Sequence, residues 1–420
     1  MPMCGFLVSV ESGNSSRISR RGPDCTTRTR IGPFTFVHSL LSITGAFTPQ
    51  PFVDGDIVCL YNGEIYNHPF SQSDGEVLIP LYRQYGVEFP RHLDGEFAIA
   101  LYDFAKEIVV FATDPFKTKP LFINGVQCAS YRSGVGGDKA KPNEVVVKRF
   151  DGSLLDRMAV REWDLSQWKT TYDDWIDQFE RAMAKRARAD CFLGLSSGYD
   201  SGAMACALLE LGVRFKAYIY EGQESLVVLE ERRRLVDSTT FWPDMSLRDW
   251  LRVNIDDESY TIVCDSGPVS KTILEDGASI GLATIAHLAR MEGRRVALSG
   301  QGSDEIMSDY SPWPDQSTLK GTFPDPLQLW PNFNFSCQES YLMKEEYVAG
   351  AFGIENRYPF LDADLVQEFL WLSASAKNRY YKAPLHEYLT RHAFPFEEGA
   401  KRGFLIDLQQ LVTAPRQTKA

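Results

Sequence analysis

The chain has 420 residues, a length that predicts two or three domains at about 150 residues each. Apolar residues make up 44% and charged residues 24%, the ordinary mixture of a globular protein, which excludes disordered, collagen-like and coiled-coil chains. Asp and Glu number 56 against 44 Lys and Arg, so the net charge of −12 argues against general attraction to nucleic acid or to an anionic membrane.

The eight cysteines are scattered, and no two of them form a CxxC pair. This spacing predicts neither a disulfide scaffold nor a zinc ribbon, and it fits a reducing compartment. The apolar residues 1–10 lack the length, the basic residues and the cleavage site of a secretory signal. No stretch approaches the ~18 apolar residues that a membrane helix needs, so we expect a cytoplasmic protein.

Short strands separated by turns are predicted over residues 1–160. Runs rich in Val, Ile, Phe and Tyr favour strands over 4–10, 56–61, 97–102, 108–113 and 144–150. Apolar residues at helical spacing predict one helix over 74–85. The Gly-, Pro- and Lys-rich stretch 133–143 is typical of a surface loop.

After Trp163 the pattern changes to strands that alternate with helices. It predicts, in order, a helix over 172–189, a strand over 191–195, a helix over 201–211, a strand over 214–220, a helix over 280–291 and a strand over 295–298. Such alternation is typical of a parallel sheet covered by helices. We therefore expect a domain boundary near residues 155–170, and a frayed polar tail from Thr413.

A Ser- and Gly-rich turn, LSSGYDSG at residues 195–202, joins a predicted strand to a predicted helix. Backbone N–H groups and the helix dipole converge at such a turn and favour an anion. Its serine hydroxyls add donors, and Asp200 suits Mg²⁺ held against a phosphate. The Walker pattern GxxxxGK[ST] is absent, and the turn instead resembles the SGGxDS loop of ATP pyrophosphatases, with Ser197 in place of one Gly. A turn that only connects strand and helix is the alternative.

A second acidic turn, SGQGSDE at residues 299–305, follows the predicted strand over 295–298. Open α/β sheets bind ligands at the carboxyl ends of their strands. The two turns are therefore expected to face one nucleotide, with Asp200 and Asp304 sharing a metal. For each turn considered alone, the alternative is a polar turn at the end of a strand that binds no ligand.

Taken in order, the motifs resemble the glutamine-hydrolysing asparagine synthetase family over nearly the whole chain. In the second half they are LSSGYDS (195–201), LSGQGSDE (298–305), FGIENRYPFLD (352–362), YYKAPLHEYL around Lys382, and KRGF (401–404). The first half resembles a class II glutamine amidotransferase domain through MCGF (3–6), RGPD (21–24), SLLSITG (39–45), YNGEIYNH (61–68), SDGEVL (73–78), LDGEFAIALYD (93–103), TDPFKTKPLF (113–122) and ASYRS (129–133).

The resemblance implies a two-domain α/β protein. Residues 1–160 would form an Ntn-hydrolase-like αββα sandwich, and residues 165–412 an ATP-pyrophosphatase domain with a parallel sheet. ATP and Mg²⁺ are the implied cofactors, and glutamine, ATP and a carboxylic acid are the implied small-molecule partners. Neither nucleic acid nor a membrane is an expected partner, and a homodimer is left open.

In the first half, the resemblance makes Cys4 the nucleophile that attacks the glutamine amide, with its own α-amino group as the base. Asn62 and Gly63 match the oxyanion hole, and Glu64 and Asp74 match the groups that hold the glutamine α-amino end. A buried strand cysteine without a catalytic role is the alternative for Cys4.

Two features of the first half depart from the family. Three residues precede Cys4, so initiation at Met3 followed by removal of Met, or further processing, is expected to free its amine. Leu40 stands where the family has an Arg that pairs with the glutamine α-carboxylate. This replacement removes a charge-assisted contact worth ~2–4 kcal/mol if desolvated, and it puts glutaminase activity in doubt.

In the second half, the resemblance assigns metal binding to Asp200 and Asp304, and charge stabilisation during adenylation and amide formation to Lys382. Arg357 and Asp362 match a segment that we expect to be structural. The residues assigned to ATP and pyrophosphate are Leu195, Ser196, Ser197, Gly198, Asp200, Ser201, Ser299 and Gly300.

Gln301 is a further departure, because asparagine synthetases have Glu in this turn and the related β-lactam synthetases have Tyr. Gln neither accepts a proton as a base nor supplies a negative charge to a substrate ammonium. It predicts an acceptor other than aspartate, or another way of recognising it. The six histidines show no metal-ligand spacing, and His386 and His392, expected on a helix surface near Lys382, are given no role.

The leading interpretation is an ATP-dependent carbon–nitrogen ligase that adenylates aspartate or a related acid, releases AMP and pyrophosphate, and amidates with ammonia from glutamine. The alternative is a β-lactam-synthetase-like ligase that uses an intramolecular or separate amine and retains an inactive glutaminase domain. Asp200, Asp304 and Lys382 argue against a catalytically inactive binding protein, and the net charge argues against a tRNA-modifying enzyme.

Overall fold

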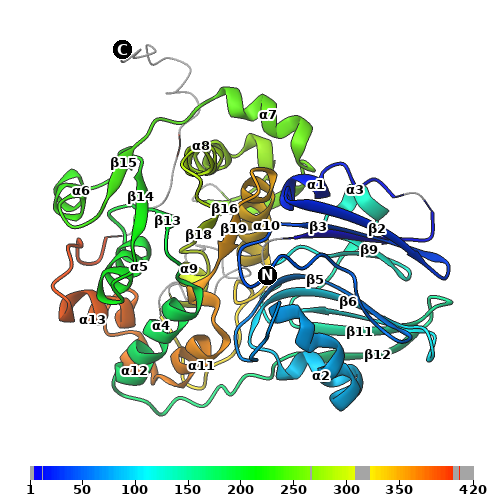
Figure 1. Cartoon of the computed structure of the whole chain (residues 1–420). Coiled ribbons are helices and arrows are strands. Elements are labelled where there is room, and N and C mark those ends of the chain that lie inside the picture. The colour runs from blue at the N-terminus through cyan, green and yellow to red at the C-terminus, as the bar shows by residue number, and fades with distance from the viewer. Residues whose placement is uncertain (1–3, 12, 265–266, 308–321, 401–405, 407–420) are drawn as a thin grey trace.

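The computed structural model describes residues 4–11, 13–264, 267–307, 322–400 and 406. Within them the strands form two six-stranded antiparallel sheets, a five-stranded parallel sheet and a two-stranded hairpin (Figure 1). Residues 1–3, the whole KRGF motif (401–404) and the tail from Thr413 lie outside the described residues. Of the helices that are described, none is both long enough and apolar enough to cross a membrane.

The antiparallel sheets are built from residues 5–159. The first, in the order β10-β8-β9-β1-β3-β2, contains β1 (Gly5–Ser9), β2 (Cys25–Ile31), β3 (Phe34–Leu40), β8 (Phe122–Asn124), β9 (Gln127–Ala129) and β10 (Asp138–Lys139). The second, in the order β12-β11-β7-β6-β5-β4, contains β4 (Phe52–Asp54), β5 (Ile57–Ile65), β6 (Gly95–Asp103), β7 (Ile108–Thr113), β11 (Glu144–Arg149) and β12 (Leu154–Ala159). The helical segments here are α1 (Ile18–Arg21), η1 (Asp74–Val77), α2 (Leu78–Tyr85), η2 (Gly86–His92) and α3 (Arg132–Val135).

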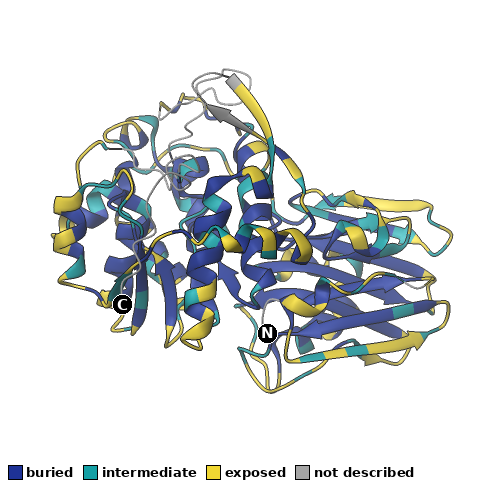
Figure 2. Ribbon diagram, turned by 90° about the horizontal axis from the view of Figure 1, so that it is seen from above, coloured by how far each residue is buried: buried dark blue, intermediate teal, exposed yellow. Residues whose placement is uncertain are grey.

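The two antiparallel sheets pack face to face over an aromatic core. Phe34 and Phe36 on β3 meet Tyr102 on β6, with ring centroids 4.9 and 5.2 Å apart. Helix α2 buries Leu78 and Tyr82 against the outer face of the second sheet, while helices including α1 and α10 (Ser336–Ala351) cover the first. The order of layers is therefore helix, sheet, sheet, helix (Figure 1). Many of the strands in these sheets are buried along most of their length (Figure 2).

The parallel sheet, in the order β15-β14-β13-β18-β19, belongs to the second half of the chain. Its strands are β13 (Cys191–Gly194), β14 (Phe215–Ile219), β15 (Ser238–Thr240), β18 (Val296–Leu298) and β19 (Glu355–Arg357), and the hairpin is β16 (Ser259–Cys264) and β17 (Gly267–Thr272). The helical segments are α4 (Asp173–Arg186), α5 (Tyr199–Glu210), α6 (Leu226–Arg233), α7 (Ser246–Asn254), η3 (Ile273–Glu275), α8 (Gly277–Met291), α9 (Ser303–Met307), α10, η4 (Pro359–Leu361), α11 (Ala363–Trp371), α12 (Ala374–Lys377) and α13 (Ala383–Arg391).

The parallel sheet has helices on both faces. Side chains of α4, α5, α11 and α13 share one core with the sheet, and those of α8 and α10 share another on the opposite face. From β13, successive strands run outward through β14 and β15 on one side, and β18 and β19 lie on the other. The chain order thus reverses between β13 and β18, and at such a point a crevice opens outside the carboxyl ends of the strands.

Most predicted elements are present, with ends that differ by a few residues. The exception is the stretch 133–143, where a loop was predicted and the structure has the end of α3 and strand β10. Helix α3 ends at Gly136, whose φ of 65° reverses the chain, and Asp138 then pairs with Ile123 of β8. Glycine marks a tight turn here and not an extended loop. The helix predicted over 74–85 is a 3₁₀ turn capped by Ser73, followed by α2.

Candidate active sites in the two halves

The loop between β13 and α5 is held in one shape by its own side chains and by a buried arginine. The Ser196 hydroxyl lies 2.8 Å from that of Ser201 and accepts from the Gly198 N–H at 3.1 Å. The Arg232 guanidinium donates to the carbonyls of Ser196 and Gly198. A Cβ on Gly202 would lie 2.2 Å from Arg232 Nη2, so glycine is needed for this close approach.

A carboxylate side chain of the protein, that of Glu224, accepts hydrogen bonds from this loop. The Ser197 N–H donates to the carboxylate of Glu224 at 2.7 Å, and the Ser197 hydroxyl donates to the same oxygen. Leu195, at the start of the loop, is buried, and its N–H donates to Tyr218 O at 2.9 Å. The loop therefore presents an N–H and a hydroxyl donor to a carboxylate oxygen of the protein itself. Binding of a phosphate by this loop stays a prediction.

Three predicted site residues from three segments converge at the end of the sheet. The Lys382 ammonium lies 2.6 and 2.7 Å from the two carboxylate oxygens of Asp200 and 2.8 Å from Asp304. Lys382 precedes α13 with a φ of 47°, and Asp200 and Asp304 stand in the first turns of α5 and α9. The hydroxyl of Ser303 also donates to Asp200 at 2.5 Å.

Burial and charge act on these groups in opposite directions. Burial favours neutral Lys382, but the carboxylates of Asp200 and Asp304 outweigh it and raise the pKa of the ammonium. Burial raises the pKa of Asp200, the Lys382 charge lowers it, and the neighbouring Asp304 charge raises it. The cluster thus holds two carboxylates and one ammonium, a set that suits a cation and a phosphate together.

A cavity of about 230 Å³ opens beside this cluster at the point where the strand order reverses. Side chains from β13, β14, β18, α8 and α10 form its walls. Its lining includes Leu195, Ser196, Asp200, Ser201, Tyr218, Glu224, Ile285, Ser299, Gly300, Gln301, Asp304, Glu305 and Glu345. The Ser299–Gly300 turn approaches α5 closely, since a Cβ on Gly300 would lie 3.2 Å from Asp200 Cβ.

Glu345 on α10 was not predicted as a site residue. Its carboxylate lines the cavity and accepts from the Ser299 hydroxyl at 2.6 Å, and that hydroxyl accepts from the N–H of Gln301 at 3.1 Å. Burial raises the pKa of Glu345 to about 7, although the Ser299 hydrogen bond opposes this shift. No local pattern in the sequence sets Glu345 apart, since it is one of three Glu residues in α10 and its neighbour Glu346 is also acidic.

Cys4 lies at the start of β1 and is completely buried. It packs in one apolar cluster with Leu40 and Tyr61. Burial raises the pKa of its thiol to about 12, while a hydrogen bond with the Leu41 backbone lowers it. Among the described residues, Arg21 reaches Cys4 through the main chain, donating to Cys4 O at 3.3 Å.

Asn62 and Gly63 are neighbouring residues of β5, so they face opposite sides of the sheet. The Asn62 side chain is completely buried, and neither its oxygen nor its nitrogen has a hydrogen-bond partner among the described residues. Gly63 has a φ of 144°, and a Cβ there would lie 1.8 Å from Glu96 O on β6. A buried amide without a partner is costly, and such groups are expected where a ligand or a reacting atom completes the bond.

The two carboxylates assigned to glutamine lie in different surroundings. Asp74 is buried in the first half, where it accepts from the Tyr61 hydroxyl at 2.5 Å and the Ile65 N–H at 2.8 Å. Glu64 faces the second half, and its carboxylate lies 2.8 Å from the Arg357 guanidinium. Burial raises the pKa of Asp74, and the Glu64 charge raises it further, so the two carboxylates are nevertheless near each other.

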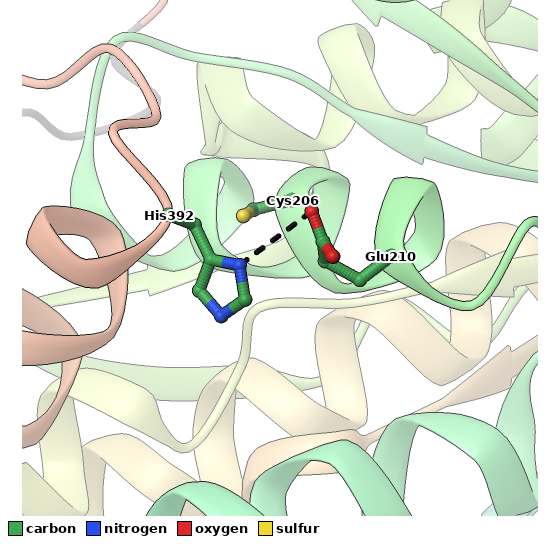
Figure 3. A group of neighbouring side chains, drawn as sticks. All are labelled: Cys206, Glu210 and His392. Carbon is green, nitrogen blue, oxygen red and sulfur yellow. Dashed lines mark ion pairs between the residues drawn. The ribbon is translucent and has the colours of Figure 1, made fainter.

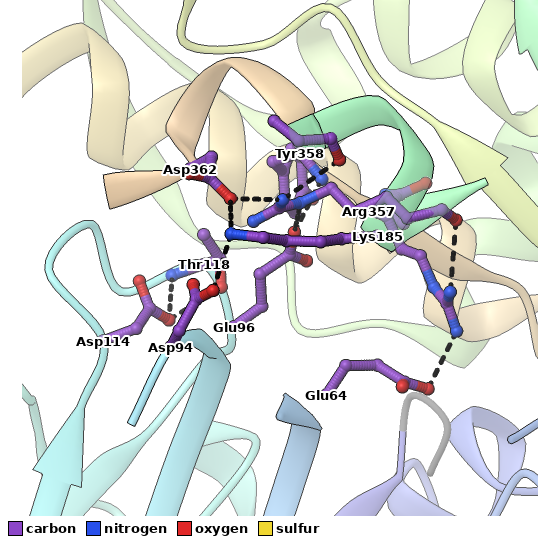
Figure 4. Close-up of polar contacts among 12 residues, drawn as sticks. Glu64, Asp94, Glu96, Asp114, Thr118, Lys185, Arg357, Tyr358 and Asp362 are labelled. Carbon is purple, nitrogen blue, oxygen red and sulfur yellow. Dashed lines mark hydrogen bonds and ion pairs between the residues drawn. The ribbon is translucent and has the colours of Figure 1, made fainter. Parts of the chain in front are cut away.

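Buried ion pairs cross between the two halves (Figure 4). Arg186 donates to Glu96 at 2.7 Å and to Asp362 at 2.9 Å, and Lys185 lies 2.9 Å from the same Asp362. Asp362 also caps α11. Figure 4 shows the Arg357 guanidinium directed toward Glu64 and the Asp362 carboxylate directed toward Lys185.

Comparison with known proteins finds relatives over most of the chain. Residues 7–184 match the glutamine amidotransferase domain family. The putative glutamine-hydrolysing asparagine synthetase 1 of Methanocaldococcus jannaschii is 26% identical over 387 residues, which cover 80% of this chain and 69% of that protein. The probable glutamine-hydrolysing asparagine synthetase of Schizosaccharomyces pombe is 25% identical over 427 residues, which cover 90% of this chain and 75% of that protein.

A solved structure, NMN synthetase from Francisella tularensis, aligns with 56% of this chain and 99% of its own at 10% identity. The TM-score of 0.24 is too low to indicate a common fold.

Proposed function

We propose that the chain is a member of the family of glutamine-hydrolysing asparagine synthetases and, on this premise, an ATP-dependent amide-forming ligase. It adenylates a carboxylate, aspartate or a related acid, with release of AMP and pyrophosphate. Ammonia from glutamine then attacks the acyl adenylate. The first step belongs to residues 165–412, an ATP-pyrophosphatase domain, and the release of ammonia to residues 1–160, an Ntn-hydrolase-like sandwich.

The convergence of Lys382, Asp200 and Asp304 beside the cavity carries the proposal. The two carboxylates fit Mg²⁺, which prefers carboxylate oxygens together with phosphate oxygens and supplies positive charge there when it is bound. Lys382 stabilises negative charge that develops on the phosphate and on the reacting carboxyl group. The Ser197 donors, which hold the Glu224 carboxylate in this structure, orient the pyrophosphate end of ATP.

For the acceptor, Glu345 supplies the carboxylate that Gln301 lacks. Both residues are joined to the Ser299 hydroxyl and line the same cavity. A carboxyl group with a pKa near neutrality accepts a proton from the attacking amine and releases it again at a physiological pH. We therefore assign acceptor recognition and proton transfer to Glu345.

In the first half, Cys4 attacks the glutamine amide, and the oxyanion is bound by the Gly63 N–H and by the Asn62 amide, which has no partner among the described residues. Asp74 and Glu64 hold the glutamine α-amino group. The free amine of Cys4, after removal of the residues before it, takes the thiol proton and lowers the cost of forming the thiolate in this buried position.

One observation favours a second candidate. Leu40 packs beside Cys4 in an apolar cluster, where a guanidinium would be needed to pair with the glutamine α-carboxylate. The second candidate is a β-lactam-synthetase-like ligase in which an amine on the substrate replaces ammonia and the first half is retained without glutaminase activity.

The test measures pyrophosphate from ATP over a panel of amino- and peptidyl-carboxylates, with Asp200→Ala as the disabled variant. Asp237→Ala is the matched control, because this aspartate sits in an exposed ion pair with Lys216. Pyrophosphate release that Asp200→Ala abolishes and Asp237→Ala preserves supports adenylation, and equal release from both variants refutes it.

The two candidates are separated by glutamate release without ATP, measured on protein whose chain has been shown to begin at Cys4. Glutamate release that Cys4→Ala abolishes supports the first candidate. No release from protein that begins at Cys4 supports the second. Aspartate as the sole good acceptor would contradict the role given to Gln301.

A further inference from the structure

Three side chains with different metal-binding atoms meet at the end of α5 that is remote from the proposed active site (Figure 3). Cys206 and Glu210 lie one turn apart on α5, and His392 immediately follows α13. The Cys206 sulfur, a Glu210 carboxylate oxygen and a ring nitrogen of His392 all lie within 4.8 Å of one another. At 1.5 Å per residue, Cys206 lies about 9 Å and Glu210 about 15 Å along the helix from Asp200.

The spacing of these atoms suits a tetrahedral ion. Zinc binds thiolate sulfur at about 2.3 Å and imidazole nitrogen or carboxylate oxygen at about 2.0–2.2 Å. Donor atoms around such an ion lie about 3–4 Å apart. His392 Nδ1 is already 3.5 Å from Glu210 Oε1, and Figure 3 shows the ring and the carboxylate turned toward each other. Small side-chain rotations are therefore enough to close the three ligands on one ion.

The second ring nitrogen of His392 faces another carboxylate. His392 Nε2 lies 3.9 Å from Glu180 Oε1 on α4. A histidine that binds a metal through one nitrogen commonly directs the other N–H to a carboxylate, which fixes the tautomer and strengthens the ligand. At 3.9 Å, Glu180 is beyond hydrogen-bond distance but close enough to take this role after a small side-chain movement.

The surroundings favour positive charge and give the ion a route in. Both α5 and α13 end at the cluster, so their carbonyl-rich, negative ends point toward it. Cys206 is buried, whereas the Glu210 side chain is 55% exposed and that of His392 24% exposed. One side of the cluster is thus open to water, which can enter with the ion and supply a fourth ligand.

We propose that Cys206, Glu210 and His392 form a zinc site with three protein ligands and one water. Zinc displaces the thiol proton of Cys206, which passes to solvent, and binds the resulting thiolate together with neutral His392 Nδ1. The ion ties α5 to α13. Because Asp200 stands at the start of α5 and Lys382 immediately precedes α13, the site braces the two helices that carry the proposed catalytic ion pair.

The test uses full-length protein freed of metal with a chelator and then titrated with Co²⁺, which takes tetrahedral zinc sites and gives a thiolate-to-metal absorption band. Excess Mg²⁺ is present to occupy carboxylate-only sites. We expect one Co²⁺ per chain with a thiolate band, displaced stoichiometrically by Zn²⁺, and a melting temperature that rises with either metal. Absence of the band in the unsubstituted protein overturns the proposal.

Four variants assign the site. Cys206→Ser is expected to abolish the thiolate band, and His392→Gln to weaken metal binding at least 10-fold. The matched controls are Cys337→Ser, a buried cysteine on α10, and His386→Gln, the histidine of the same helix α13, and both are expected to retain the band. If Cys206→Ser does not fold, Glu210→Gln on the exposed side replaces it, with a weakening of at least 10-fold. A band that persists in His392→Gln with unchanged affinity refutes the assignment.

Discussion

The ion pair of Lys382 with Asp200 and Asp304 yields the sharpest prediction, which concerns Lys382→Met. Methionine keeps most of the buried volume of the side chain but removes the ammonium. In the structure that ammonium is 2% exposed and lies 2.6–2.8 Å from carboxylates that are 24% and 26% exposed. Without it, two carboxylates face each other with no cation between them.

The expected cost follows from this burial. Removing one partner of a buried ion pair costs about 3–5 kcal/mol, and because water still reaches both carboxylates we expect the lower end, about 3 kcal/mol. In a domain of this size that loss corresponds to a fall of about 6–12 °C in melting temperature. Millimolar Mg²⁺ should recover more than half of it, since the two carboxylates then bind the divalent ion in place of the ammonium.

The assay is thermal unfolding with and without Mg²⁺ at constant ionic strength. Lys216→Met is the matched control, since Lys216 pairs at 2.6 Å with Asp237, whose side chain is 67% exposed. Such a surface pair contributes less than about 1 kcal/mol. The reasoning about the ion pair is refuted if Lys382→Met has the same melting temperature as the control Lys216→Met. It is also refuted if Mg²⁺ raises the melting temperature of Lys382→Met no more than that of the unsubstituted protein.

The remaining predictions concern one residue each. Burial raises the pKa of Glu345 to about 7 from 4.5, so the contribution of this residue to stability is lost as pH rises through 7. The unfolding free energy of Glu345→Gln should therefore exceed that of the unsubstituted protein at pH 8 but not at pH 4. Urea denaturation at the two pH values measures this difference. Arg357→Met removes the buried cation that pairs with Glu64 and Glu355, and it should cost about 3–5 kcal/mol. The exposed Arg83→Met should cost less than about 1 kcal/mol, and equal costs would argue against the buried pair. Asn62→Ala removes an amide with no partner among the described residues, so its stability should stay within about 1 kcal/mol while glutamine hydrolysis falls about 10²–10³-fold; a large loss of stability would indicate a structural role.

Local patterns were sufficient for the parts of the fold where sequence neighbours are also spatial neighbours. The apolar run at 191–195 and the turn after it predicted β13, α5 and their junction, because a strand, a Ser/Gly turn and a helix follow one another directly. The convergence of Asp200 and Asp304 followed from the rule that parallel strands end at one edge. Lys382 could be added only through the resemblance to a family, since a lone lysine has no local signature.

Contacts between distant segments could not be predicted in the same way. Glu345 lies on α10, a helix buried on several sides whose apolar residues form no single stripe, so nothing local directs its carboxylate to Ser299. Arg357 and Glu64 come from the two different halves of the chain. Which carboxylate Arg357 contacts therefore depends on how the two halves pack against each other. Likewise, His392 meets Cys206 only because α13 packs on α5.

Adjacent residues of α10 reach into both halves of the protein. Glu345 lines the cavity at the end of the parallel sheet, whereas Glu346 is completely buried, with Arg21 at 2.7 Å and Lys119 at 3.0 Å, both from the first half. Separating the two halves would leave Glu346 on one piece and these two buried cations on the other, each without its partner. The first half therefore contributes to the stability of the second whether or not the Cys4 thiol is reactive.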